Sequence, residues 1–132
     1  MEVYIIPMFE DNYCYYITRN LQTHPGILID VAEPAKLQRF MQTMSINLEP
    51  TAIFSTHKHW DHTSGNQEMK GVFPNLQIYG GAADNVPGQT EGLQNGRVFE
   101  MNDLRITCLH TPCHTRGHMC YYFEPVEGVT EG

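Results

Sequence analysis

The sequence of 132 residues is short of several features that mark large functional classes. It has 8 basic residues against 15 acidic ones, a formal net charge of −7, and no cluster of Lys and Arg. Nucleic-acid binders usually carry a basic face that displaces counterions from phosphates, so we expect no nucleic-acid partner. No run approaches the ~18 apolar residues of a membrane span, so we expect no membrane partner either.

The N-terminus and the cysteines indicate a reducing compartment. The opening residues MEVYIIPMFEDN lack the basic segment of a secretion signal and the arginine-rich face of a transit peptide. Cys14, Cys108, Cys113 and Cys120 form no C-x-x-C pair, and we expect free thiols. Cys113 lies in a histidine-rich loop, where inward packing of the sulfur is more common than metal ligation. We therefore expect a cytoplasmic protein.

One domain, residues 1–132, with interleaved helices and strands is expected. A chain of this length buries roughly two-thirds of its unfolded surface. Apolar residues recur every three or four positions after Pro34, and this pattern predicts an amphipathic helix over residues 33–44. A second helix is predicted at 64–70. Residues 80–96 read as a surface loop and 124–132 as a frayed tail. Strands are predicted at 3–7, 12–18, 26–31, 51–56, 76–80, 98–101, 104–110 and 118–123. The fold class is α/β or α+β with a β-rich core.

The densest group of metal-binding side chains follows the predicted strand 51–56. The stretch FSTHKHWDHTSGN places His57, His59, Asp61 and His62 within six residues. Side chains alternate between the faces of a strand, so His57 and His59 point the same way. Asp61 and His62 swing toward them where the chain turns. Imidazole nitrogens and carboxylate oxygens suit Zn²⁺, with Fe or Mn as alternatives. The stretch therefore predicts a metal site rather than a solvated polar loop.

The neighbouring residues are assigned no chemistry. Lys58 and Trp60 point away from the two histidines, and we expect an exposed lysine and a tryptophan that anchors packing. A serine nucleophile is the competing catalytic arrangement. The chain has no G-x-S-x-G elbow, and Ser64 stands in a turn-like T-S-G, so this reading is set aside.

A third ligand is expected from a distant loop, because a catalytic zinc normally takes three protein ligands and one water. The stretch LHTPCHTRGH offers His110, His114 and His118. His110 closes one predicted strand and His118 opens the next, whereas His114 lies mid-loop after a proline that restrains the turn. His114 is the favoured ligand, and His110 and His118 are candidates for supporting or structural roles, with the choice among the three left open.

These motifs resemble those of the metallo-β-lactamase-fold hydrolases. T-H-x-H-x-D-H, a following G-N, and H-T-P-x-H-T-x-G-H stand in the order of that family. DNYCYYI, STHKHWDHTSGN and TPCHTRGHMCYY are most similar to glyoxalase II, the hydroxyacylglutathione hydrolases. The Trp before the aspartate favours this branch over the nucleases of the fold. GILIDVAEP resembles the family's early strand and acidic turn, which places Asp30 near the site in a supporting role. The resemblance covers nearly all of the chain and implies an αββα sandwich.

The resemblance also implies how the ligands are divided. It assigns His57, His59 and His114 to a first metal, and Asp61 and His62 to a second. The family's bridging aspartate, in a T-G-D strand, a further histidine and a C-terminal helical region that binds glutathione all lie downstream of the matched segment. We therefore expect a sandwich incomplete at its C-terminus, a first site with its three histidines, and a second site without its bridge.

The implied activity is metal-dependent hydrolysis of a glutathione thioester, such as S-lactoylglutathione, to a hydroxy acid and glutathione. In the family a metal lowers the pKa of a bound water toward ~7 and stabilises the developing oxyanion. The thiol, with a pKa near ~8.5, leaves as thiolate without a strong general acid. Asp61, as a ligand, takes a catalytic role by holding the nucleophile in line. No stretch indicates which residues bind the substrate.

The alternative hypothesis is a protein that is not an enzyme. A chain that ends within the fold exposes sheet edges and an apolar face, which favours pairing with a second copy or another chain. The protein would then be a catalytically silent short variant or subunit that binds metal or a partner. Turnover of S-lactoylglutathione discriminates the two hypotheses. A phosphodiesterase on the same fold is disfavoured by the acidic charge and by Trp60.

Overall fold

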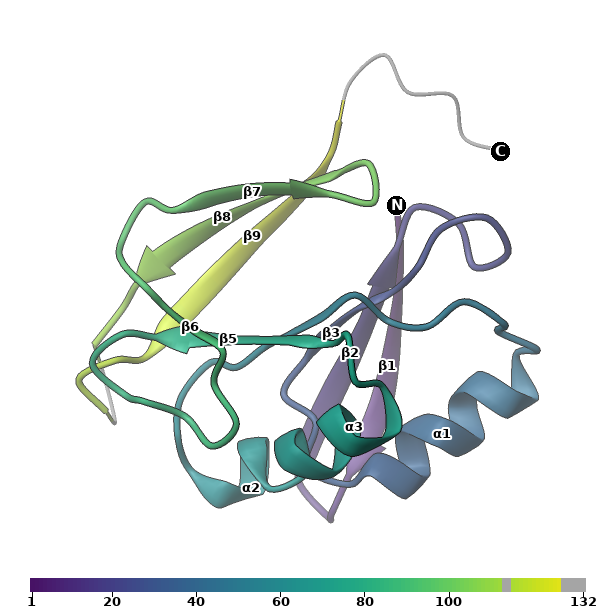
Figure 1. The fold of residues 1–132 in the computed structure, drawn as a ribbon, viewed down its shortest axis with the longest axis horizontal. Helices are drawn as coiled ribbons and strands as arrows, with labels where there is room; N and C mark the ends of the chain where they lie inside the picture. The colour runs from purple at the N-terminus through teal and green to yellow at the C-terminus, as the bar shows by residue number, and fades with distance from the viewer. Residues whose placement is uncertain (113–114, 127–132) are drawn as a thin grey trace.

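Two β-sheets and one layer of helices make up the part of the chain that the computed structural model describes, residues 1–112 and 115–126 (Figure 1). The elements, in chain order, are β1 (Glu2–Met8), β2 (Asn12–Thr18), β3 (Ile27–Ile29), α1 (Pro34–Thr43), β4 (Ala52–Phe54), α2 (Trp60–Thr63), α3 (Asn66–Val72), β5 (Gln77–Gly81), β6 (Glu91–Leu93), β7 (Val98–Met101), β8 (Leu104–His110) and β9 (Met119–Pro125).

The first sheet contains β1 to β6 in sequence order, and the second contains β7 to β9. β1, β2 and β3 pair antiparallel, whereas β3 to β6 pair parallel. Parallel neighbours need a crossover, and α1 and the α2–α3 segment supply the crossovers on either side of β4. Figure 1 shows the helices on one side of the first sheet and β7–β9 on the other. This helix–sheet–sheet order confirms the predicted mixed α/β class.

Strands β3 and β4 lie in the middle of the layers and are buried on both faces. Every residue of both strands is buried, as expected for parallel strands covered on two sides. Leu28 and Ile53 face the helices and share a cluster with Leu37 of α1. The other face packs against the second sheet through Phe54, which contacts four aromatic rings at centroid distances of 4.9–6.3 Å, those of Tyr79, Phe99, Tyr121 and Phe123.

The prediction of a loop over residues 80–96 was wrong in part. β5 ends at Gly81, and β6 pairs parallel to it through Glu91, Gly92 and Leu93. A three-residue strand with a central glycine has no alternating pattern to detect. The glycine has a packing reason, because a Cβ on Gly92 would lie 2.9 Å from the Cα of Ala82.

The short helix predicted at 64–70 is present as α3, but α2 was missed. α2 begins at Trp60, in a stretch whose pattern predicted the end of a strand followed by a turn. At the other end of the chain, β9 continues to Pro125, two residues into the segment expected to be frayed, and residues 127–132 lie outside the described part. None of the helices in residues 1–112 and 115–126 has the length and apolarity to cross a bilayer.

Three of the cysteines are free thiols, as predicted. Cys14 and Cys108 are buried, and Cys120 is exposed. Burial raises the pKa of the Cys108 thiol to about 11 and also raises that of Cys14. Both buried thiols are therefore protonated at neutral pH and belong to the core. Cys113 lies outside the described residues.

The central position of Phe54 predicts a large effect on stability. Phe54→Ala removes a fully buried ring that contacts both sheets, and we expect the free energy of unfolding to fall by about 3–5 kcal/mol. Val98→Thr is the control, because Val98 is 49% exposed and the new side chain keeps the β-branch. Its effect should stay within about 0.5 kcal/mol. Urea denaturation measures both, and similar losses in the two variants would contradict the packing described.

Candidate metal centre

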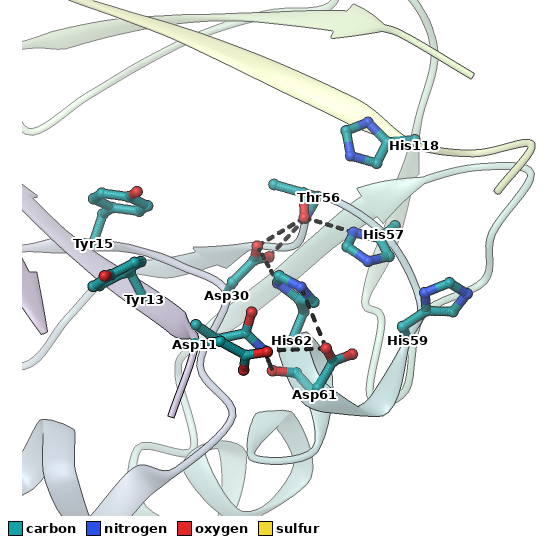
Figure 2. Close-up of a pocket in the computed structure, with 11 residues that line it drawn as sticks. Asp11, Tyr13, Tyr15, Asp30, Thr56, His57, His59, Asp61, His62 and His118 are labelled. Atoms are coloured by element: carbon teal, nitrogen blue, oxygen red, sulfur yellow. Dashed lines mark hydrogen bonds and ion pairs between the residues drawn. The ribbon is translucent and has the colours of Figure 1, made fainter. Parts of the chain in front are cut away.

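A pocket of about 520 Å³ opens where the parallel strands β3 and β4 end (Figure 2). The carboxyl ends of parallel strands are the usual place for ligands in sheets of this kind. The pocket is lined by side chains from the start of β2, from the loops after β3 and β4, and from the residue before β9: Asp11, Asn12, Tyr13, Tyr15, Asp30, Thr56, His57, His59, Asp61, His62 and His118.

Three imidazole rings surround the buried ring of His57. The ring centroid of His57 lies 4.3 Å from that of His62, 4.8 Å from that of His59 and 5.2 Å from that of His118. The His118 ring is stacked on it, with an interplanar angle of 27°. Two of these rings come from α2 or its N-cap, and His118 is the residue that directly precedes β9 of the second sheet. The fold therefore gathers imidazoles from positions about 60 residues apart in the sequence.

Asp30 organises this group from the end of β3. Its carboxylate accepts hydrogen bonds from the Thr56 amide at 2.8 Å, from the Thr56 hydroxyl at 2.7 Å and from His62 Nδ1 at 3.0 Å. Its backbone has a φ of 55°, in the left-handed region, which Asp tolerates better than most residues. That turn lets β3 end and its carboxylate reach the loop after β4. The supporting role expected for Asp30 is consistent with these contacts.

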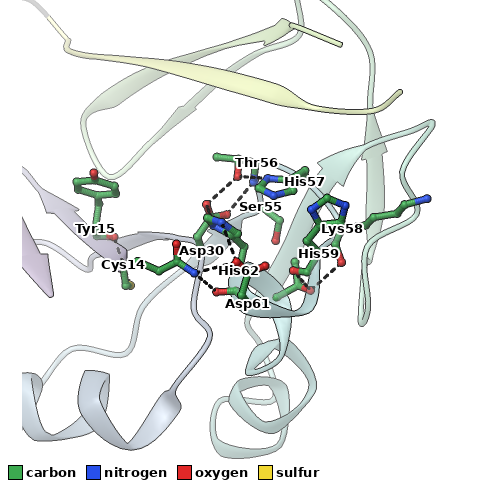
Figure 3. A network of polar contacts seen from close by, with 12 residues as sticks. Cys14, Tyr15, Asp30, Ser55, Thr56, His57, Lys58, His59, Asp61 and His62 are labelled. Atoms are coloured by element: carbon green, nitrogen blue, oxygen red, sulfur yellow. Dashed lines mark hydrogen bonds and ion pairs between the residues drawn. The ribbon is translucent and has the colours of Figure 1, made fainter. Parts of the chain in front are cut away.

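The network fixes which nitrogen of two histidines carries the proton (Figure 3). The Thr56 hydroxyl has one proton and donates it to Asp30, so it accepts from His57 Nδ1, which lies 2.9 Å away. His62 Nδ1 donates to the Asp30 carboxylate directly. In the neutral rings of His57 and His62 the lone pair therefore lies on Nε2. A fixed tautomer of this kind is what a metal-ligating histidine needs.

The charges around the rings also suit metal binding. Burial, followed by the neighbouring charge of His62, lowers the pKa of His57, so this ring is neutral at pH 7. The hydrogen bond to Asp30 raises the pKa of His62. The Asn12 side-chain amide donates to Asp61 Oδ2 at 3.1 Å and lowers the pKa of that carboxyl group. The site therefore presents a neutral imidazole beside an ionised carboxylate.

Helix α2 places Asp61 and His62 at the pocket. His59 is its N-cap, with an extended backbone, and Asp61 and His62 follow in its first turn. Asp61 Oδ2 lies 3.7 Å from His62 Nε2. The turn predicted to carry Asp61 and His62 is therefore a turn of α-helix.

Trp60, which also lies in α2, does not anchor packing as expected. It is 68% exposed and contacts Phe9 edge to face at 5.2 Å, because the first turn of α2 directs it outward. The side chain of Lys58 is exposed, as predicted, and Figure 3 shows it extending away from the network.

The second histidine-rich stretch contributes unequally. His118 lines the pocket, and its Nδ1 lies 3.0 Å from the Thr111 hydroxyl. His110 is not among the residues that line the pocket. Its Nε2 donates to the Arg116 carbonyl at 2.5 Å, which ties the base of its own loop together. His114, the favoured third ligand, lies outside the described residues.

Two contributors to the site were missed in the sequence. Asn12 orients Asp61 from 49 positions away, and Thr56 relays the charge of Asp30 to His57. Asn12 stands in the DNYCYYI stretch, which was read as a turn and a strand. Thr56 precedes the first histidine and was read as the end of a strand. Both roles depend on hydrogen bonds across strands, which local patterns do not reveal.

The donors fit a zinc-type ion, although the described residues do not complete a site. Among residues 1–112 and 115–126, no three His, Cys, Asp or Glu side chains are close enough to hold a metal ion. The available donors are imidazole nitrogens of fixed tautomer and one ionised carboxylate, which are the ligand types that Zn²⁺, Fe and Mn take.

Comparison with known sequences gives one family. The profile of the metallo-beta-lactamase superfamily matches residues 8–127. The chain is 35% identical to the cytoplasmic hydroxyacylglutathione hydrolase of Arabidopsis thaliana over 97% of this chain and 49% of that protein. It is 35% identical to the hydroxyacylglutathione hydrolase of Synechocystis sp. over 100% of this chain and 51% of the relative. The chain thus spans about half the length of these curated relatives.

Solved structures give the same fold at low sequence identity. The subclass B3 metallo-beta-lactamase BJP-1 of Bradyrhizobium japonicum aligns with a TM-score of 0.77 and 19% identity, over 95% of this chain and 56% of that one. ETHE1 from Myxococcus xanthus aligns with a TM-score of 0.76 and 20% identity, over 93% of this chain and 54% of that one. At these identities the likeness supports the fold alone.

The Asp30–His62 hydrogen bond predicts a pH effect in the metal-free chain. A raised pKa of His62 stabilises the fold fully below the ordinary histidine pKa of about 6.5, and this stabilisation is lost as the pH rises through the raised value. Asp30→Asn should lower the pKa of His62 and flatten this dependence. NMR titration of the histidine ring protons measures the pKa. Asp103→Asn, at the β7–β8 turn, is the matched control, and an unchanged His62 pKa in Asp30→Asn would contradict the assignment.

Proposed function

Because this chain belongs to the metallo-beta-lactamase superfamily, we propose that it acts as a metal-dependent hydrolase of glutathione thioesters. The observation that carries the proposal is the hydrogen-bond network in which Asp30 sets the tautomers of His57 and His62 beside the ionised Asp61. The relatives named hydroxyacylglutathione hydrolase support the substrate class. The Arabidopsis thaliana relative is named as cytoplasmic, which supports a cytosolic setting.

The proposed ligands follow the motif order. His57, His59 and His114 hold a first ion, and Asp61 and His62 contribute to a second. Zn²⁺ is the proposed metal, with Fe and Mn as alternatives of the same coordination chemistry. When bound, such an ion supplies a water of lowered pKa as nucleophile and stabilises the negative charge that develops on the thioester carbonyl oxygen.

The chain's own residues prepare this site in three ways. Asp30 and Thr56 hold protons on the Nδ1 atoms of His57 and His62, and so keep the Nε2 lone pairs available. Asn12 donates two hydrogen bonds to Asp61, one to its carboxylate and one to its carbonyl, and so holds the carboxylate in place. The thiol of glutathione, with a pKa near ~8.5, leaves as thiolate, so no protein group has to protonate it.

The pocket has the size of a small-molecule site. Its volume of about 520 Å³ falls within the range of roughly 300–1,000 Å³ typical of ligand pockets. Tyr13 and Tyr15 line it beside the histidines and present aromatic surface. We propose that the acyl side of the thioester lies between these rings and the imidazoles.

A second candidate is a metal-binding subunit without turnover, and one surface favours it. β1 is an edge strand of the six-stranded sheet, and its side chains Val3 and Ile5 are 50% and 60% exposed. Tyr13, which pairs with Pro7 on the same face, is 50% exposed. Exposed apolar strands at a sheet edge favour association with another copy or another chain. Enzymatic turnover decides between the two candidates.

The decisive assay is hydrolysis of S-lactoylglutathione by the Zn²⁺-loaded chain. We expect turnover that disappears on chelation, and a loss of about a hundredfold or more in His57→Ala, because the ion contributes several kcal/mol to transition-state stabilisation. His24→Ala is the matched control, since His24 pairs with Asp103 far from the pocket, and it should retain activity. Loss of the ultraviolet absorbance of the thioester measures the rate. A loaded wild-type chain no faster than free Zn²⁺ would support the silent subunit instead.

A further inference from the structure

Asp84 is a buried carboxylate that bonds to both histidine-bearing loops. It lies between β5 and β6 and is 5% exposed. Its Oδ2 accepts hydrogen bonds from the Lys58 amide at 2.9 Å and from the Thr115 hydroxyl at 2.7 Å. Its Oδ1 accepts from the Gly117 amide at 2.7 Å. One carboxylate therefore satisfies three donors from two loops that are far apart in the sequence.

The bonded positions lie directly beside candidate ligands. Lys58 stands between His57 and His59, so its amide moves with both imidazoles. Thr115 and Gly117 belong to the segment that leads into His118, whose ring stacks on His57 at 5.2 Å. Hydrogen bonds from backbone amides to a carboxylate are short and roughly twice as strong as neutral ones. Asp84 is thus placed to hold one loop against the other.

Two glycines allow this close approach. A Cβ on Gly81 would lie 2.0 Å from the Gly117 carbonyl oxygen, and a Cβ on Gly117 would lie 2.4 Å from the Asp84 amide nitrogen. Both distances are impossible for real side chains in contact with backbone. The end of β5, the Asp84 turn and the 115–117 segment are therefore packed backbone to backbone, with little freedom to shift.

The loops are joined at a second point as well. The Met119 amide donates to the Thr56 carbonyl at 2.7 Å, just before His57. The hydrogen bond from the Lys58 amide to Asp84 lies just after His57 in the sequence. A connection on each side of His57 fixes both the separation and the rotation of one loop relative to the other, which a single contact would not do.

We propose that Asp84 is a positioning residue of this site. Its carboxylate sets the spacing between residues 57–59 and residues 115–118, and so the position of the proposed ligands His57 and His59 relative to the segment that brings His118 to the pocket. The inference rests on the proposed metal-dependent function, and it assigns to Asp84 no contact with substrate or metal.

The isosteric change Asp84→Asn tests this role. Wherever its amide group points, an NH₂ faces either the Lys58 amide or the Gly117 amide, and neither can accept a hydrogen bond. One connection between the loops is therefore lost while the shape is kept. We expect the affinity for Zn²⁺ to fall by about tenfold or more, the loss typical when a supporting residue of a metal site is changed.

A second pair of variants keeps the carboxylate. Thr115→Val removes the hydroxyl that donates to Asp84 and should weaken Zn²⁺ binding by about two- to tenfold. Thr115→Ser retains a hydroxyl and should restore the affinity. If Asp84→Asn does not fold, the two Thr115 variants alone test whether the bond to Asp84 supports Zn²⁺ binding. Asp103→Asn, the same substitution at the far end of β8, should bind as the wild type does.

Two readouts separate positioning from a loss of stability. Competition with a chromophoric chelator gives the Zn²⁺ affinity, and the visible absorption of the Co²⁺-substituted chain reports the ligand geometry. Weaker binding with altered Co²⁺ bands in Asp84→Asn supports the proposal. Wild-type affinity and bands in Asp84→Asn, or equal binding by Thr115→Val and Thr115→Ser, overturn it.

The same measurements distinguish this proposal from that of the hydrolase. A wild-type chain that binds Zn²⁺ without hydrolysing the thioester, while Asp84→Asn binds more weakly, supports the positioning role and overturns only the hydrolase. A wild-type chain that binds no Zn²⁺ overturns both.

Discussion

The Asp30 carboxylate is the constraint on which the site depends. Parallel pairing of β3 with β4 brings the ends of both strands to the same edge, so Asp30 meets the loop after β4. Its three hydrogen bonds hold the Thr56 backbone, the Thr56 hydroxyl and the His62 ring at once. These hydrogen bonds favour the tautomers of His57 and His62 that carry the proton on Nδ1. The positive φ of Asp30 is the local strain that this arrangement tolerates.

Two buried aspartates divide the work of holding the histidine loop. β4 lies between β3 and β5 in the sheet, and each neighbour leads at its carboxyl end to one aspartate. The Asp30 carboxylate accepts a hydrogen bond from the Thr56 amide. The Asp84 carboxylate accepts one from the Lys58 amide, two residues further along the chain. The first aspartate acts on ring orientation and the second on the position of the backbone. A loop that follows the central strand is therefore held from both sides.

How far the sequence predicts the site depends on the range of the interactions. His57, His59, Asp61 and His62 lie within six residues, so local spacing was enough to predict that they group together, although β4 ends at Phe54 and Asp61 and His62 lie in α2 rather than in a simple turn. Asp84 was invisible, because it stands in a Gly- and Pro-rich stretch that reads as a loop, and its partners lie 26 to 33 positions away. The same holds for the strands of the first sheet, where the three-residue β3 and β4 lie within apolar runs and were found, whereas the three-residue β6, with its central glycine, was not.

Contacts of Tyr121 link the aromatic core between the sheets to the histidine loop. The Tyr121 hydroxyl of β9 donates to the Ser55 carbonyl at 2.6 Å, and burial raises its pKa, so the proton stays on the phenol. Ser55 is the first residue after β4 and lies two positions before His57. The Tyr121 ring also contacts Phe54, so the packing of the second sheet on the first sets where the histidine loop begins. The position of His57 therefore depends on contacts between the sheets as well as on its own hydrogen bonds, and a change in the core reaches the pocket without touching any of its histidines.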